Sequence, residues 1–281
     1  VRGPGCLRLN KGGTAMDKED LKRLAENPEF IQSIYNYCDR WCERCPFTSH
    51  CLNFAMDSEE FGDQEAHDIN NEAFWQRLTE TFQMTLELLH EAAEEEGIDL
   101  ESIDAKEFEE QDRLNKELAK NHQCSRAAKL YSEMVDDWFD SAKDIFGHED
   151  DEPDLEVSAD MGDVDPAEEI SDFGEAVEVV RWYQHLIYVK LMRAIHGELD
   201  ERLEVLDEFP KDSDGSAKVA LIGLDRSIAA WGEIRNLFPH RDNDILDTLV
   251  HLEQLRRNVE KAFPEARAFI RPGFDKIDLN S

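Results

Sequence analysis

Apolar residues recur every three or four positions along most of the chain, which is the spacing of a helix with one buried face. The first such stretch begins at Asn27-Pro28, a good N-cap and N1 pair, and is expected to end at Pro46, because proline breaks a helix interior. A second helix is expected from about 70 to 96, with Gly97 in the position that commonly ends a helix. No stretch shows the period of two that is typical of a strand, so the pattern predicts an all-α protein.

The second half of the chain is expected to form longer helices. A bend is predicted at 121–125, where residues of poor helix propensity gather, and a loop is predicted at 211–215. The helix that begins at Pro166 has apolar residues on nearly all of its faces, which is typical of a central, buried helix. The expected ranges are 104–146, from 166 onward, 216–238 and from 242 to about 263. These helices and their connections predict an antiparallel helical bundle.

Composition divides the chain into parts of different character. Residues 1–15 are rich in glycine and lack acidic residues, so we expect a disordered extension ahead of a natural start at Met16. No Lys or Arg occurs from 144 to 180, and proline and glycine interrupt this stretch, which indicates an acidic linker. The expected parts are the extension at 1–15, a Cys-rich helical segment at 16–60, helices of the bundle at 61–146, the acidic linker at 147–164 and further helices of the bundle at 165–281.

The chain is strongly acidic, and this narrows the range of its partners. Its 281 residues include 31 Lys and Arg against 65 Asp and Glu, which gives a formal net charge of −34. Nucleic acids and anionic membranes both attract basic surfaces, so neither is an expected partner, whereas a protein with a basic surface is. The start of the chain lacks the apolar core of a secretory signal, and no apolar run approaches the length of a spanning helix. A cytoplasmic location is therefore expected.

Four of the six cysteines fall within fourteen residues, in the pattern C-x3-C-x2-C-x5-C. Cys38, Cys42 and Cys45 are spaced i, i+4 and i+7, which places three sulfurs on one face if the segment is helical. Pro46 then ends the helix, and the turn that follows is expected to bring Cys51 back towards the same point. Packed core thiols and disulfides explain this density less well than metal binding, because a cytoplasmic location disfavours disulfides. We therefore expect an N-terminal metal-binding segment with these four cysteines as ligands.

Part of this segment resembles two known iron–sulfur segments. The resemblance is carried by Cys42-Glu-Arg-Cys45-Pro-Phe-Thr-Ser-His-Cys51. One segment is the C-terminal cluster segment of RecB-like nucleases, including CRISPR-adaptation nucleases, and the other belongs to the auxiliary-cluster (SPASM) region of some radical SAM enzymes. In both families these cysteines help to hold a four-iron cluster, so the resemblance implies an iron–sulfur cluster here. The chain shows neither the acidic and lysine constellation of a nuclease nor a barrel of alternating strands and helices, so the resemblance extends to the cluster and not to those activities.

Two other kinds of metal site remain open. Zinc bound by the same four cysteines would give a protein-interaction module without redox chemistry. Glu87 and His90 form one E-x2-H pair of the kind that ferritin-like di-iron bundles use twice. Arg40 and Arg44 lie between the cysteines, where their charge is expected either to offset a bound anionic centre or to pair with neighbouring acids in solvent.

A bundle enzyme is a further alternative, with its pocket among the apolar helices 175–208 and 216–238. Three polar residues on these helices would be the first candidates for such a pocket: Arg181, His185 and Asp225. Buried polar groups need partners, so Arg181 and Asp225 are expected to pair with each other inside the bundle.

Overall fold

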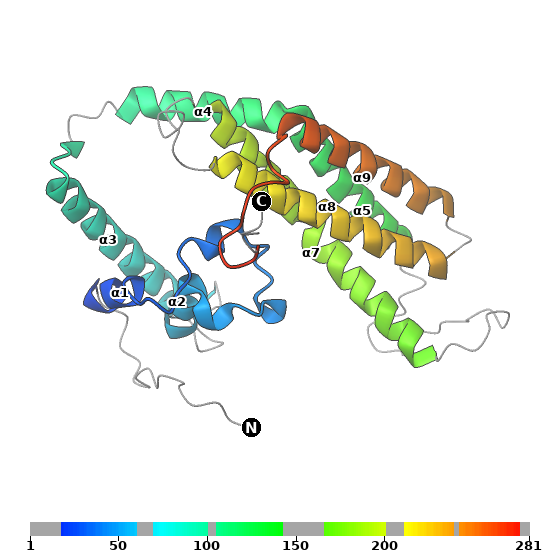
Figure 1. The fold of residues 1–281 in the computed structure, drawn as a ribbon, viewed down its shortest axis with the longest axis horizontal. Helices are drawn as coiled ribbons and strands as arrows, with labels where there is room; N and C mark the ends of the chain where they lie inside the picture. The colour runs from blue at the N-terminus through cyan, green and yellow to red at the C-terminus, as the bar shows by residue number, and fades with distance from the viewer. Residues whose placement is uncertain are drawn as a thin grey trace, which may run out of the picture. The chain divides into compact units, whose positions relative to one another are not determined.

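The computed structural model describes residues 18–60, 70–100, 105–142, 166–200, 211–238 and 242–275. Within these ranges the chain is all-helical and has no strand, as the sequence predicts (Figure 1). The predicted extension at 1–15 and the predicted acidic linker at 147–164 lie outside the described residues. None of the described helices combines the length and the apolar character needed to cross a membrane.

Residue contacts divide the chain into two compact units. The first unit comprises 1–35 and 42–104, and the second comprises 36–41 and 105–281. The six residues 36–41 therefore belong to the second unit, although the chain on both sides of them belongs to the first.

The first unit contains three described α-helices: α1 (Lys18–Ala25), α2 (Leu52–Glu60) and α3 (Glu72–Glu95). Helix α3 confirms the helix predicted at 70–96. Gly97 follows it with φ 70°, and the N–H of Ile98 donates to the carbonyl of Ala93 at 2.8 Å. Glycine tolerates this left-handed conformation, and the hydrogen bond satisfies a carbonyl at the helix end.

The helix predicted from Asn27-Pro28 to Pro46 is wrong. This stretch contains only short 3-10 turns, η1 (Ile34–Tyr37) and η2 (Cys42–Arg44), and a third, η3 (Thr48–His50), follows it. Between η1 and η2 the side chain of Asp39 accepts a hydrogen bond from the N–H of Trp41 at 3.3 Å, and Arg40 has φ 60°. Aspartate competes with the helix by such local hydrogen bonds, and a left-handed residue ends any helical run.

The second unit contains α4 (Ala105–Asn121), α5 (Gln123–Ser141), α7 (Pro166–Leu199), α8 (Asp212–Leu237) and α9 (Asp242–Ala262). The bend predicted at 121–125 is confirmed, because α4 and α5 are separate helices. His122 between them caps α5, its side chain accepting from the N–H of Cys124 at 3.2 Å.

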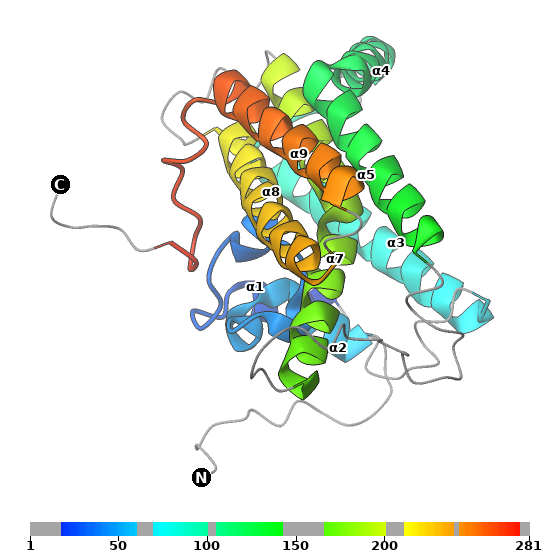
Figure 2. The same ribbon diagram turned by 90° about the vertical axis from the view of Figure 1, so that its right-hand side faces the viewer.

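The helices of the second unit share one hydrophobic core. Helix α7 contacts α4, α5 and α8, and α9 contacts α5 and α8 (Figures 1 and 2). Tyr183, Ile187 and Leu191 of α7 and Trp231 of α8 are fully buried in this core. The prediction that α7 is central is confirmed by its contacts, but its burial is not complete, since Val189 is 56% exposed.

The predicted loop at 211–215 is also wrong, because its last four residues form the first turn of α8. Asp212 and Asp214 lie in this turn, where negative charge favours the positive end of the helix dipole. The absence of a side chain at Gly215 lets the ring of Tyr37 pack directly against α8, since a Cβ at this position would lie 2.4 Å from that ring. At position 215, glycine therefore allows close packing against the helix and does not mark a loop.

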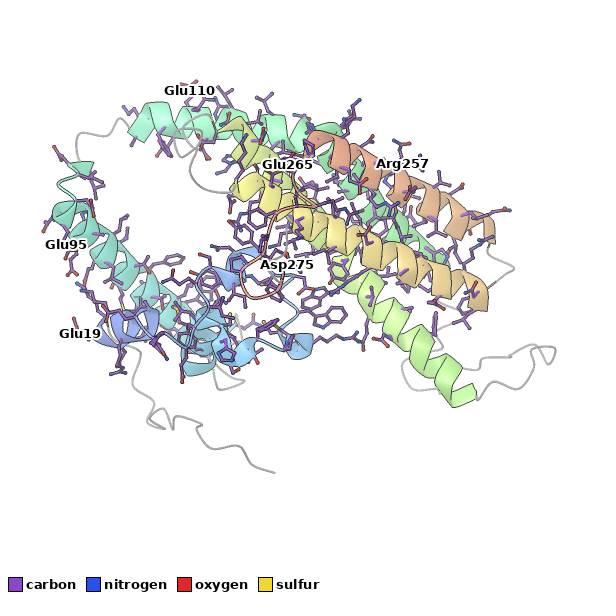
Figure 3. The ribbon with its side chains drawn as sticks, in the orientation of Figure 1. Glu19, Glu95, Glu110, Arg257, Glu265 and Asp275 are labelled. Carbon is purple, nitrogen blue, oxygen red and sulfur yellow. The ribbon has the colours of Figure 1, made fainter. Side chains whose placement is uncertain are left out.

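Charged side chains cover the outside of the second unit. In Figure 3, Glu110 on α4 and Arg257 on α9 lie on the outer sides of their helices, and both are exposed. Asp275, in the segment after α9, is less exposed and makes ion pairs with Lys218 at 2.7 Å and Arg271 at 3.0 Å. The pair with Lys218 holds the segment after α9 to α8, and the pair with Arg271 lies within the segment itself.

Candidate functional site

Residues 36–41, which we call the Cys38 segment, pack against α7 and α8 within the second unit. The carbonyl of Asn36 accepts hydrogen bonds from Arg193 at 3.2 Å and from Lys190 at 3.4 Å. Arg193 also donates two hydrogen bonds to Asp212, at 3.1 and 2.6 Å. This bidentate pair is geometrically specific, so it fixes the side chain that holds Asn36.

Tyr37 anchors the start of the Cys38 segment to α8. Its hydroxyl donates to Asp212 at 3.0 Å, and its ring lies 4.7 Å from the ring of Phe269, centroid to centroid. Burial and then the negative charge of Asp212 raise the pKa of Tyr37 to about 12. The hydroxyl is therefore protonated at neutral pH and remains a donor.

Asp39 anchors the middle of the Cys38 segment. Its carboxylate accepts from the hydroxyl of Tyr183 at 2.6 Å and from Arg226 at 2.8 Å, and Arg226 also donates to the Tyr183 hydroxyl. The carbonyl of Asp39 accepts from the indole N–H of Trp182 at 2.9 Å. Burial and then the Asp39 carboxylate raise the pKa of Tyr183, so this hydroxyl also stays a donor.

Trp41 anchors the end of the Cys38 segment by ring contacts. It stacks on Trp182 with centroids 4.9 Å apart and an interplanar angle of 14°, and it meets the ring of Tyr183 edge-on at 6.2 Å. Offset or tilted aromatic pairs of this kind contribute about 0.5–1.5 kcal/mol beyond their buried area. Cys38 therefore sits between two anchored residues, Tyr37 and Asp39.

Lys190 lies beside the Cys38 segment, at the carbonyl of Asn36, and is 6% exposed. Burial lowers the pKa of this amine, and the opposing influences come from Cys38 and, less strongly, from Asp39. Among the described residues, no carboxylate lies within ion-pair distance of its Nζ. A buried ammonium is costly without an anion nearby, so Lys190 is a cation that the fold leaves without a close ionic partner among the described residues.

The other three cysteines belong to the first unit and lie in short turns. Cys42 begins η2, and the N–H of Cys45 donates to its carbonyl at 3.1 Å. Cys51 follows η3, and its N–H donates to the carbonyl of Thr48 at 3.3 Å. Each of the four cysteines is half-buried, and none forms a disulfide.

The shared helical face expected for Cys38, Cys42 and Cys45 is absent, because the segment is not a helix. Among the described residues, no three or more His, Cys, Asp or Glu side chains lie in a group that could hold a metal ion. The chemistry of the donors nevertheless fits an iron–sulfur cluster, since cysteine thiolates are its usual ligands. Convergence of the four sulfurs remains a prediction. Arg40 and Arg44 are both exposed.

The predicted pair of Arg181 and Asp225 is wrong. Arg181 donates to Asp136 at 3.2 Å, while Asp225 pairs with Arg267 at 2.6 Å and with Arg256 at 3.4 Å. Each of the two residues faces a different neighbouring helix or segment, and both ion pairs are partly open to solvent. Two polar residues on neighbouring apolar helices therefore do not have to pair with each other.

The remaining candidates do not form a metal site within the described residues. Glu87 and His90 are both exposed on α3, and His185 is exposed on α7. The contacts that sequence reasoning missed are those of the Cys38 segment with Lys190 and Tyr183. The available signal was a lysine inside a strongly apolar helix, three residues after the buried Ile187.

Comparison with known proteins gives no relative. No family model matches the chain, and neither a curated protein nor a solved structure matches it. The description of this protein accordingly rests on its own fold and site. In the residues that the structure describes, it is an all-helical protein in which part of the cysteine-rich segment is anchored to a helical core.

Proposed function

We propose that this chain is a helical iron–sulfur protein, with a cluster of the four-iron type held by Cys38, Cys42, Cys45 and Cys51. The observation that carries the proposal is the set of four half-buried cysteines, none in a disulfide, within fourteen residues. Iron–sulfur clusters are held by thiolates and are often shielded from water on one side. The anchoring of the Cys38 segment supports the proposal, because a fixed ligand needs little ordering when the metal binds.

Other residues of the Cys38 segment have roles in this proposal. The ammonium of Lys190 offsets the negative charge on Cys38, while Tyr37 and Trp41 limit the access of water from either side. When bound, the cluster supplies a one-electron redox centre whose potential depends on nearby charge and on solvent exposure. The proposed role is electron transfer, redox sensing or support of a larger assembly.

We also propose an arrangement for the helices of the second unit and a kind of protein partner. The helices of the second unit would form an antiparallel bundle, which serves as the rigid support for the Cys38 segment. The net charge of −34 favours a protein partner with a basic surface, and such an association weakens as salt is added.

The experiment is purification without oxygen, followed by a visible absorption spectrum and measurement of iron, acid-labile sulfide and zinc. We expect a brown protein with matched iron and sulfide. The double variant Cys42→Ser with Cys45→Ser removes two ligands and should lose nearly all of the iron. Cys124→Ala is the matched control, because Cys124 is a buried cysteine in α5, and it should keep the full metal content.

Three results would contradict the cluster. A colourless protein with one zinc ion would support the zinc-stabilised module instead. A protein without metal after anaerobic purification and reconstitution with iron and sulfide would exclude both sites. Full iron content in the double variant would mean that other residues are the ligands.

A further inference from the structure

Lys190, in the C-terminal half of α7, is almost completely buried. Lysine is rarely buried to this degree unless an anion pairs with it. Its ammonium donates to the carbonyl of Asn36, which carries no charge, and no carboxylate of the described residues forms an ion pair with it. The chain has 65 acidic residues, so a shortage of acids does not explain why this cation is left unpaired.

Two acids hold the Cys38 segment in place, and other cations occupy both of them. Asp212 accepts two hydrogen bonds from Arg193, at 3.1 and 2.6 Å, and Asp39 accepts one from Arg226 at 2.8 Å. Arg193 also donates to the carbonyl of Asn36, and its positive charge opposes that of Lys190. The surroundings of Lys190 therefore favour an anion that the described part of the chain does not supply.

The place where such an anion would lie is next to Cys38. Asn36, whose carbonyl contacts the ammonium of Lys190, is two residues before Cys38 in the chain. Burial lowers the pKa of Lys190, and the strongest influence that opposes burial is Cys38. Cysteine binds metals as the thiolate, and a centre with four thiolate ligands is anionic. The proposed cluster would supply the anion that Lys190 lacks.

We propose that Lys190 is the fixed counter-charge of the centre at Cys38, and that its charge raises the reduction potential of that centre. This inference rests on the proposed cluster. Reduction adds one negative charge to a cluster, so a fixed cation stabilises the reduced form more than the oxidised form. Without the metal, the same buried ammonium is unpaired and lowers the stability of the fold. Lys190 therefore serves the bound centre at a cost to the metal-free chain.

The first experiment is a redox titration of the iron-loaded full chain without oxygen, followed by visible absorption. Lys190→Met should reduce the equilibrium constant for one-electron reduction by about tenfold, which is a shift of about 59 mV to a more negative potential. Lys190→Gln is a second neutral variant that keeps a hydrogen-bond donor, and it should shift the potential in the same direction. Lys129→Met is the matched control, because Lys129 is an exposed lysine of α5, and it should leave the potential unchanged.

The second experiment is urea unfolding of the metal-free full chain, with circular dichroism to check the helical content. Lys190→Met should raise the urea midpoint, because an apolar side chain of similar length replaces an unpaired buried ammonium. A lysine that only supports the fold would give the opposite result, so the two experiments together separate a role toward the centre from a structural role.

Three results would overturn the inference. An unchanged potential in an iron-loaded Lys190→Met variant would do so and would leave the proposed cluster intact. A lower urea midpoint in metal-free Lys190→Met would show that another part of the chain pairs with Lys190. A wild type that binds no iron would overturn both the proposed cluster and this inference.

Discussion

At the scale of single residues, Asp275 is the group whose ionisation is most clearly linked to the fold. Burial on its own raises the pKa of this carboxyl, but hydrogen bonds from Arg271 and Lys218 outweigh it, so the pKa lies well below its usual range. A carboxyl with a depressed pKa in the folded state adds stability above its unfolded pKa, and this stability is lost as the pH falls through the folded value. The stabilisation should therefore be fully present from about pH 5 upward.

We expect Asp275→Asn to lower the free energy of unfolding at pH 7 by about 1–3 kcal/mol, because it removes charge-assisted hydrogen bonds to two cations. Urea titrations at several pH values measure this. The difference from the wild type should be constant between about pH 5 and 8 and should shrink below about pH 4. Asp247→Asn, at an exposed position of α9, is the control with the same change of charge. An equal loss in both variants would contradict this account.

Residue partners were the least predictable feature of this chain. The sequence identified Arg181 and Asp225 as polar residues on apolar helices, which was correct, but the partner of each is a charge from another segment. Partner choice depends on how helices rotate against one another, and polarity alone does not encode that rotation. Lys190 shows the same limit, since its hydrogen-bond partner Asn36 is 154 positions away in the sequence.

At the scale of elements, the position of the Cys38 segment depends on a small residue in α8. A Cβ at Gly215 would lie 2.4 Å from the ring of Tyr37 and 2.7 Å from that of Phe269. Gly232 lies in the same helix, and a Cβ there would meet nothing within 4 Å. The two glycines therefore form a matched pair for testing how closely the segment packs.

Gly215→Ala is expected to lower the free energy of unfolding by about 1–3 kcal/mol, since the ring of Tyr37 must move away from the helix. Gly232→Ala is expected to raise it by roughly 0.5–1 kcal/mol, because alanine has the higher helix propensity. Thermal denaturation of the two variants measures both changes. Opposite signs are the diagnostic result, and a stabilising Gly215→Ala would mean that Tyr37 does not pack on α8.

Helices with strong end signals were predicted well. Gly97 after α3, Pro166 at the start of α7 and the poor helix formers near His122 each marked a boundary that the structure confirms. The predicted helix from Asn27 to Pro46 failed, because Tyr37, Asp39 and Trp41 are used for contacts with α7 and α8. Tertiary contacts override a local pattern most easily in a short segment.

At the scale of the whole molecule, the dominant property is the net charge of −34. Ion pairs such as Arg257 with Glu253 at 2.9 Å are exposed, and pairs of this kind contribute little to stability. The unbalanced acidic residues repel one another, and this repulsion opposes the compact state. Screening by salt should therefore stabilise the fold.

We expect the melting temperature to rise by roughly 2–5 °C between low salt and physiological ionic strength, because the screening length falls to about 8 Å. Scanning calorimetry in NaCl and in KCl measures this shift, and equal effects of the two salts identify screening as the cause. A melting temperature that falls on addition of either salt would indicate that exposed ion pairs matter more than the repulsion.

The anchoring of the Cys38 segment has a consequence for the order of folding. The hydrogen bonds that hold Asp39 join residues 143, 144 and 187 positions apart in the chain. Closing such large loops is entropically unfavourable until α7 and α8 are already paired, so non-local contacts of this kind form slowly. We therefore expect Cys38 to reach its final position late, after the longest helices have assembled. A ribosome would have to complete α8 before residues made much earlier could find their place.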